Sequence, residues 1–98
     1  MTKEEVIKQL TILTETKPII ENNIEVFHLS GDELTIMIRE THISVAIDRD
    51  FSGFYTDFSI YNYDSIKGFA IDIDTDEDDW TKFYLVIYTI SGTRYILI

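Results

Sequence analysis

Regular alternation of apolar and polar side chains is the feature that most limits how this chain can fold. It runs through residues 34–39 and 43–48 and returns at residues 69–74. A period of two places successive side chains on opposite faces of a strand, so each segment predicts a half-buried β-strand. We therefore expect a molecule built mainly from strands, each with one face turned toward a core.

The N-terminal segment has a helical pattern instead. Thr2 and Glu5 have the spacing of a capping box, in which each side chain bonds to the other residue's backbone amide. Apolar residues such as Val6 and Leu10 then recur at the spacing of one helical face. Pro18 disfavours helix at the residue before it. The pattern predicts a helix from about Lys3 to Thr16.

Strands are predicted at residues 24–29, 33–39, 42–48, 55–63, 69–74, 81–90 and 93–98. Short connections between several of them favour antiparallel pairing. The predicted fold class is α+β: a single domain over residues 1–98, with one N-terminal helix packed on a curved, mostly antiparallel sheet of six or seven strands. Residues 82–88 are apolar on both faces, which is typical of a central strand. Because one helix cannot cover two faces, we expect the sheet to curl into a barrel or sandwich, or a second copy to cover it.

The charge is strongly negative and unevenly distributed. Eighteen acidic residues against 8 basic ones give a formal net charge of −10. Residues 48–79 contain ten acids and two bases, so this segment holds −8 of that total. Contacts to phosphate need clustered Lys or Arg, so direct binding to nucleic acid or to anionic membranes is disfavoured. A basic protein partner is favoured.

The densest negative charge lies at residues 72–79. Alternation places Asp72 and Asp74 on the water-facing side of a strand, with Asp76 in line, at a spacing of ~6.6 Å that resembles the regular charges of a phosphate backbone. The alternative is a solvated loop that keeps a β-rich protein soluble. The predicted partner-binding carboxylates are Asp72, Asp74, Asp76, Glu77, Asp78 and Asp79.

Aromatic residues supply the predicted anchors of such an interface. Six of them fall within residues 51–63. Tyr and Trp are enriched among the residues that dominate binding energies, so Tyr55, Tyr61 and Trp80 are predicted as contacts, with Asp57 among them. The competing interpretation is that this aromatic cluster forms the edge of the core.

No pattern of catalytic residues is present. The sequence has no cysteine, no phosphate-binding glycine loop, no G-x-S-x-G elbow and no His-x-x-x-His pair. The two histidines, His28 and His42, each lie in a predicted strand. An EF-hand loop starting at Asp72 is rejected, because Glu77 stands where glycine is needed and Phe83 where glutamate is needed. We expect no enzymatic activity, cofactor or metal, although a weak divalent-ion site in the acidic stretch is a less favoured alternative.

No signal peptide and no long uncharged apolar run is found, which predicts a cytoplasmic protein.

In size, acidity and lack of catalytic motifs the chain resembles small phage-borne inhibitors, anti-CRISPR and anti-restriction proteins among them. This resemblance is one of overall character and covers no diagnostic motif. It implies stoichiometric inhibition, with carboxylates taking the places of phosphates on a nuclease. The alternatives are a toxin-immunity protein, or a homodimeric interaction module that uses residues 83–98.

Overall fold

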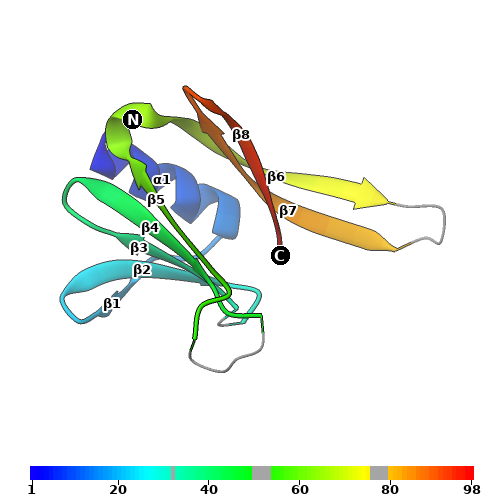
Figure 1. The fold of residues 1–98 in the computed structure, drawn as a ribbon. Coiled ribbons are helices and arrows are strands. Elements are labelled where there is room, and N and C mark those ends of the chain that lie inside the picture. The colour runs from blue at the N-terminus through cyan, green and yellow to red at the C-terminus, as the bar shows by residue number, and fades with distance from the viewer. Residues whose placement is uncertain (32, 50–53, 76–79) are drawn as a thin grey trace.

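The computed structural model describes residues 1–31, 33–49, 54–75 and 80–98. Within them lie one α-helix, α1 (Lys3–Thr14), and eight strands in two antiparallel sheets. Figure 1 shows α1 beside the two sheets, with the long β6–β7 hairpin extending away from the rest of the molecule. The five-stranded sheet contains β1 (Ile19–Glu21), β2 (Ile24–Leu29), β3 (Leu34–Ile38), β4 (His42–Ile47) and β5 (Asp57–Asn62). The three-stranded sheet contains β6 (Ile66–Thr75), β7 (Thr81–Thr89) and β8 (Gly92–Leu97).

Helix α1 begins at the predicted capping box. The Thr2 side chain accepts a hydrogen bond from the Glu5 amide, and the Glu5 carboxylate accepts one from the Thr2 amide. The helix ends at Thr14, two residues earlier than predicted, because Glu15 adopts a left-handed conformation with φ of 57°. Val6 and Leu10 are fully buried, so the predicted apolar face is the one that packs on the core.

The five-stranded sheet is a meander in the order β1-β2-β3-β4-β5. Strand β1 was not predicted. It pairs with β2 through a two-residue turn at Asn22 and Asn23, whose positive φ values of 51° and 66° suit a tight hairpin. Its length of three residues is too short for a periodic signal to stand out in the sequence.

The three-stranded sheet has the order β6-β7-β8. Strand β7 is therefore central, as its apolar character on both faces predicted. Leu85, Val86 and Ile87 are all buried, but Tyr88, on the same side as Val86, is exposed, so the expected cover on both sides is not complete. Strand β6 is ten residues long, and its last four residues are exposed. These residues form the far end of the projecting hairpin (Figure 1).

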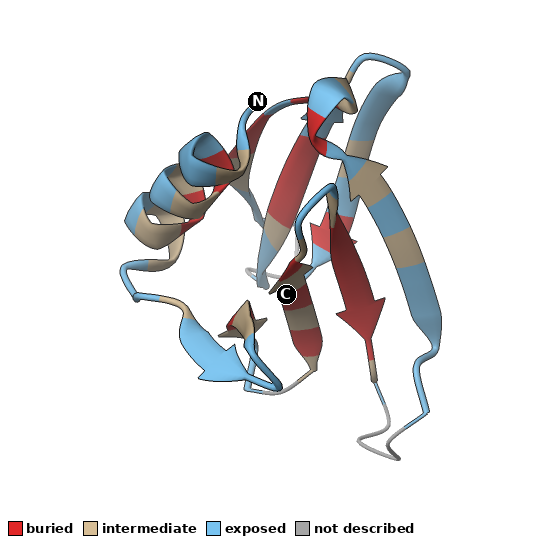
Figure 2. Ribbon diagram, turned by 90° about the vertical axis from the view of Figure 1, so that its left-hand side faces the viewer, coloured by how far each residue is buried: buried red, intermediate tan, exposed pale blue. Residues whose placement is uncertain are grey.

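The α+β class is confirmed, but the expected single curved sheet of six or seven strands is wrong in detail. A short 3₁₀-helix, η1 (Tyr63–Ser65), separates β5 from β6, so β6 starts a second sheet. Tyr63 is buried there, and its hydroxyl donates a hydrogen bond to the Arg39 carbonyl at 2.5 Å. The core lies between the inner faces of the two sheets and α1, as the buried residues in Figure 2 show.

Candidate functional site

The outer face of the three-stranded sheet carries the described part of the acidic stretch. Asp72 and Asp74 are both exposed in β6, as the alternation predicted. The Asp72 carboxylate accepts a hydrogen bond from the following amide of Ile73 at 2.9 Å. Asp72 stands opposite Tyr84 of β7, and Asp74 stands opposite Lys82. A base from the same chain therefore lies beside Asp74, which the sequence alone did not indicate.

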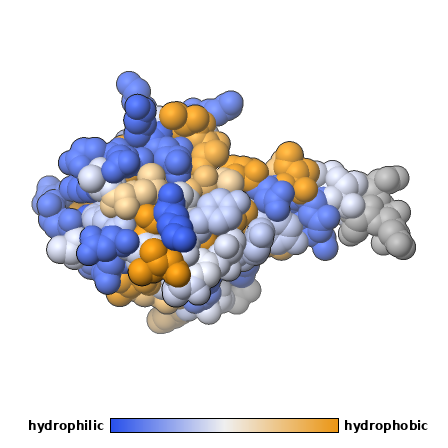
Figure 3. All heavy atoms as spheres, turned by 90° about the horizontal axis from the view of Figure 1, so that it is seen from above, coloured by the Kyte–Doolittle hydropathy of each residue, from blue (hydrophilic) through white to orange (hydrophobic). Residues whose placement is uncertain are grey.

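Four of the predicted carboxylates, Asp76, Glu77, Asp78 and Asp79, lie outside the described residues. The predicted anchor Trp80 follows them directly and is 70% exposed. Ile73 and Phe83, cross-strand partners on the opposite face of the hairpin, are also exposed because the five-stranded sheet does not reach them. In the space-filling view the projecting hairpin carries hydrophobic atoms next to hydrophilic ones (Figure 3).

Three tyrosines share the outer face with these aspartates. Tyr84 and Tyr88 lie on β7, on the same side of the strand as Lys82. Tyr95 lies on β8 opposite Val86. The rings of Tyr84 and Tyr95 meet edge to face, with centroids 6.4 Å apart. Tyr88 and Tyr95 are exposed. We call the surface formed by Asp72, Asp74, Tyr84, Tyr88 and Tyr95 the Asp–Tyr face.

Sequence reasoning missed the tyrosines of this face. The signal was present in the alternation of Lys82, Tyr84, Val86 and Tyr88, which places all four on one side of β7. A run that is apolar on both faces predicts a covered central strand, so it gives no reason to expect exposed tyrosines there. Only the register of β8 on β7 brings Tyr95 to Tyr84.

The aromatic residues predicted as anchors lie elsewhere. Tyr55 is exposed and packs against Phe58, with ring centroids 5.9 Å apart, next to the five-stranded sheet. Tyr61 is half-buried on β5 opposite the buried Ile43, so its ring faces inward. The structure brings neither residue to the Asp–Tyr face.

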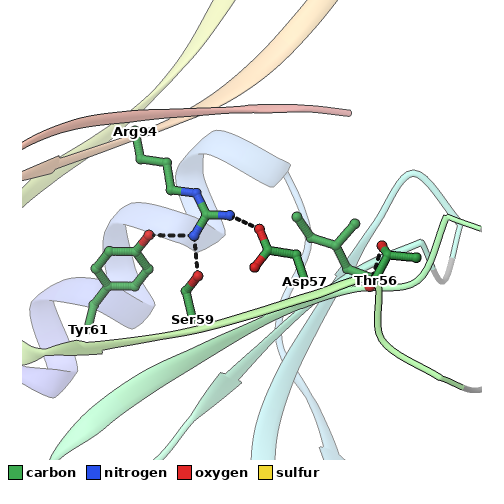
Figure 4. A network of polar contacts seen from close by, with 6 residues as sticks. Thr56, Asp57, Ser59, Tyr61 and Arg94 are labelled. Atoms are coloured by element: carbon green, nitrogen blue, oxygen red, sulfur yellow. Dashed lines mark hydrogen bonds and ion pairs between the residues drawn. The ribbon is translucent and has the colours of Figure 1, made fainter.

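Asp57 and Tyr61 instead contact Arg94, an inward-facing residue of β8 (Figure 4). The Arg94 Nη1 atom donates to the Tyr61 hydroxyl at 2.8 Å and to the Ser59 hydroxyl. The Nη2 atom donates to the Asp57 carboxylate, forming an ion pair. Partial burial lowers the pKa of Arg94, but its hydrogen bond to the Tyr61 hydroxyl and the charge of Asp57 outweigh burial and raise the pKa overall. This cluster ties the edge strand of one sheet to the edge strand of the other.

Among the described residues, one histidine lies beside a carboxylate and also lines a cavity. His28 Nε2 lies 2.8 Å from the Glu21 carboxylate, and His28 Nδ1 lies 3.1 Å from the Thr35 hydroxyl. A cavity of about 380 Å³ opens between the end of α1 and the two sheets. Its described lining residues are Thr14, Thr16, His28, Leu29, Ser30, Phe83 and Ile98, none of them an acid or a lysine.

Within residues 1–31, 33–49, 54–75 and 80–98, no group of three or more His, Asp or Glu side chains is placed to hold a metal ion. The alternative site among Asp74, Asp76 and Asp78 includes two residues outside those ranges. In the same part of the chain, α1 is too short and too polar to cross a membrane.

These features define a small acidic α+β protein of two sheets with an aromatic and acidic outer face. A scan against protein-family models and searches of curated proteins and of solved structures found no match to the chain. Its function has therefore to be argued from its own side chains.

Proposed function

We propose that this protein binds and blocks a basic protein surface, namely the nucleic-acid-binding site of a nuclease, as a stoichiometric inhibitor. The observation that supports this proposal is the Asp–Tyr face, where two exposed carboxylates and a pair of packed tyrosines share one side of a sheet. Guanidinium groups pair with carboxylates and also stack on aromatic rings, so both halves of the face suit arginine. Nucleic-acid-binding sites are rich in arginine and lysine.

The distribution of charge supports the same partner. The chain carries a net charge of −10, so a basic surface is attracted from a distance and association is accelerated at low salt. Lys82 beside Asp74 reduces the local charge but leaves Asp72 opposite an uncharged tyrosine. Asp72 is therefore the carboxylate on which we place most of the specific recognition, with Tyr84 and Tyr95 beside it.

The test uses the partner captured on the immobilised chain at low salt and then purified. The variant Asp72→Asn with Asp74→Asn is expected to bind that partner about tenfold more weakly, mostly through slower association, because charged rim contacts act chiefly on the association rate. The control is Glu4→Gln with Asp64→Asn, which removes the same charge from exposed positions elsewhere and is expected to have a smaller effect. Surface plasmon resonance at rising salt measures both.

A competition assay distinguishes blocking from mere binding. If the proposal holds, the chain displaces labelled nucleic acid from the captured protein, and the double variant does so less well. Simultaneous binding of chain and nucleic acid, or equal affinity of the double variant and the wild type, would contradict it. A captured partner that proves to be a toxin nuclease would make the protein an immunity protein that acts through the same face.

A further inference from the structure

The outer face of the five-stranded sheet has a different character from the rest of this acidic molecule. Two cross-strand rows form its centre, and they contain no acidic, lysine or arginine side chain. One row is Val26, Met37, Ser44 and Ile60, and the other is His28, Thr35, Ala46 and Phe58. We call these eight residues the neutral face.

The shape of the neutral face suits packing against another sheet. Ser44 and Ala46 are small and buried on β4, and Val26 is buried on β2, while Phe58 and Ile60 are exposed on β5. Ile60 is 57% exposed, and Phe58 continues into Tyr55 through their ring contact. Depletion of charge around exposed aromatic and aliphatic groups is the composition of an interface core.

The ends of the neutral face carry opposite charges. At one end Arg39 lies opposite His42, and its guanidinium group lies over the sheet, donating to the Ser44 hydroxyl at 3.1 Å and to the Met37 sulfur at 3.6 Å. No ion pair joins Arg39 to a carboxylate among the described residues. At the other end Glu33 lies opposite Asp48, and although Glu33 pairs with Arg49 this end has an excess of negative charge.

From this pattern we infer that the neutral face binds a second copy of the chain, forming a twofold symmetric dimer. A twofold axis in the plane of the interface and perpendicular to the strands sets Arg39 of one copy against the Glu33–Asp48 end of the other, twice. The same axis sets Phe58 against Ile60 of the other copy. The charges and the apolar groups are thus complementary in one arrangement, as a symmetric interface requires.

A second copy fits this face better than a basic partner does. A strongly basic protein meets a like charge on this face, because the Arg39 guanidinium lies over Ser44 and Met37. A second copy can instead set its Glu33–Asp48 end against that guanidinium. The neutral face and the Asp–Tyr face are the outward sides of two sheets whose inner sides share the core. A dimer formed here leaves the Asp–Tyr face of each copy open, so this inference and the proposed function can fail independently.

Analytical ultracentrifugation at rising protein concentration tests the dimer. The wild type is expected to approach twice the chain mass of 11.5 kDa. Ile60→Glu is expected to raise the dimer dissociation constant at least tenfold, and Arg39→Glu is expected to do the same by placing like charges together. Ile12→Glu, at a helix position that is 66% exposed, is the matched control and is expected to dimerise as the wild type does. Circular dichroism confirms that each variant is folded.

A third variant separates this interface from one on the other sheet. Tyr95→Glu changes an exposed residue of the Asp–Tyr face and is expected to leave the dimer intact. A wild type that stays monomeric at about 100 times the concentration used for partner binding would overturn the inference. So would a dimer that Ile60→Glu leaves unchanged, or one that Tyr95→Glu dissociates instead.

Discussion

Arg94 is the residue whose polar contacts hold the two sheets together. Its guanidinium group reaches from β8 to three side chains of β5, and the ion pair joins residues 37 positions apart in sequence. Hydrogen bonds to a charged group contribute more than neutral ones, although partial exposure of Asp57 and Arg94 weakens the ion pair. The cluster therefore stabilises the relative position of the sheets rather than either sheet alone.

Replacing Arg94 by methionine keeps the aliphatic stem and removes these contacts. We expect Arg94→Met to lower the free energy of unfolding by about 1 to 2 kcal/mol, measured by urea denaturation. The control is Arg49→Met, which breaks an ion pair to Glu33 inside one sheet and is expected to cost less. A double-mutant cycle with Asp57→Asn should show coupling of about 0.5 kcal/mol or more. Equal losses for the two arginine variants would contradict the bridging role.

Tyr63 gives the stability a dependence on alkaline pH. Burial, with added effects from Glu40, Glu4 and Glu25, raises the pKa of its hydroxyl from 10.0 to about 12. Between pH 10 and 12 the folded protein retains a proton that the unfolded chain has lost. The stabilisation from this group is therefore complete below pH 10 and is lost as the pH rises toward 12.

The variant Tyr63→Phe removes both the titration and the hydrogen bond to the Arg39 carbonyl. We expect it to lower the free energy of unfolding at pH 8 by about 1 kcal/mol. Its stability should then fall less steeply than that of the wild type between pH 10 and 12, as measured by urea denaturation at each pH. Parallel curves for the two proteins above pH 10 would show that Tyr63 does not carry this dependence.

At the scale of elements, one side-chain hydrogen bond among the described residues joins α1 to the edge of the three-stranded sheet, in addition to the packing of Val6 and Leu10 on the core. The Gln9 Oε1 atom accepts a hydrogen bond from the Phe69 amide of β6 at 2.6 Å. Phe69 is buried, and the hydrogen bond from its amide to Gln9 is partly buried. An edge strand exposes unpaired backbone groups, and here the helix covers the edge of β6 at Phe69.

Removing the acceptor tests this attachment. We expect Gln9→Leu to cost about 1 to 3 kcal/mol of unfolding free energy, because it leaves a partly buried amide without a partner. Amide hydrogen exchange should show lower protection at Phe69, while Gln9→Glu, which keeps an acceptor oxygen, should retain most of it. Unchanged protection of Phe69 in Gln9→Leu would mean that another group satisfies the amide.

At the scale of the whole molecule, the two outward sheet faces differ in charge. The Asp–Tyr face carries Asp72 and Asp74, whereas the neutral face carries the Arg39 guanidinium toward one end and the Glu33–Asp48 pair at the other. Salt should therefore weaken binding of a basic partner while it reduces the repulsion between two copies of the chain. The proposed activities are separated in space because the core lies between their surfaces.

Much of the local structure follows from the sequence alone. The capping box placed the start of α1, and the period-two alternation placed β3, β4 and most of β6 and turned Asp72 and Asp74 toward water. Each of these depends on residues within a few positions of one another, where the physics of caps, turns and side-chain alternation is local.

Only the tertiary structure decided which residues meet across the molecule. The break at η1 divides the strands into two sheets, the register of β8 brings Tyr95 to Tyr84, and Arg94 engages Asp57 and Tyr61, which were predicted to face a partner. Local alternation says which way a side chain points but not which strand lies beside it. That choice depends on packing the whole apolar core at once, and it therefore cannot be read from any one segment.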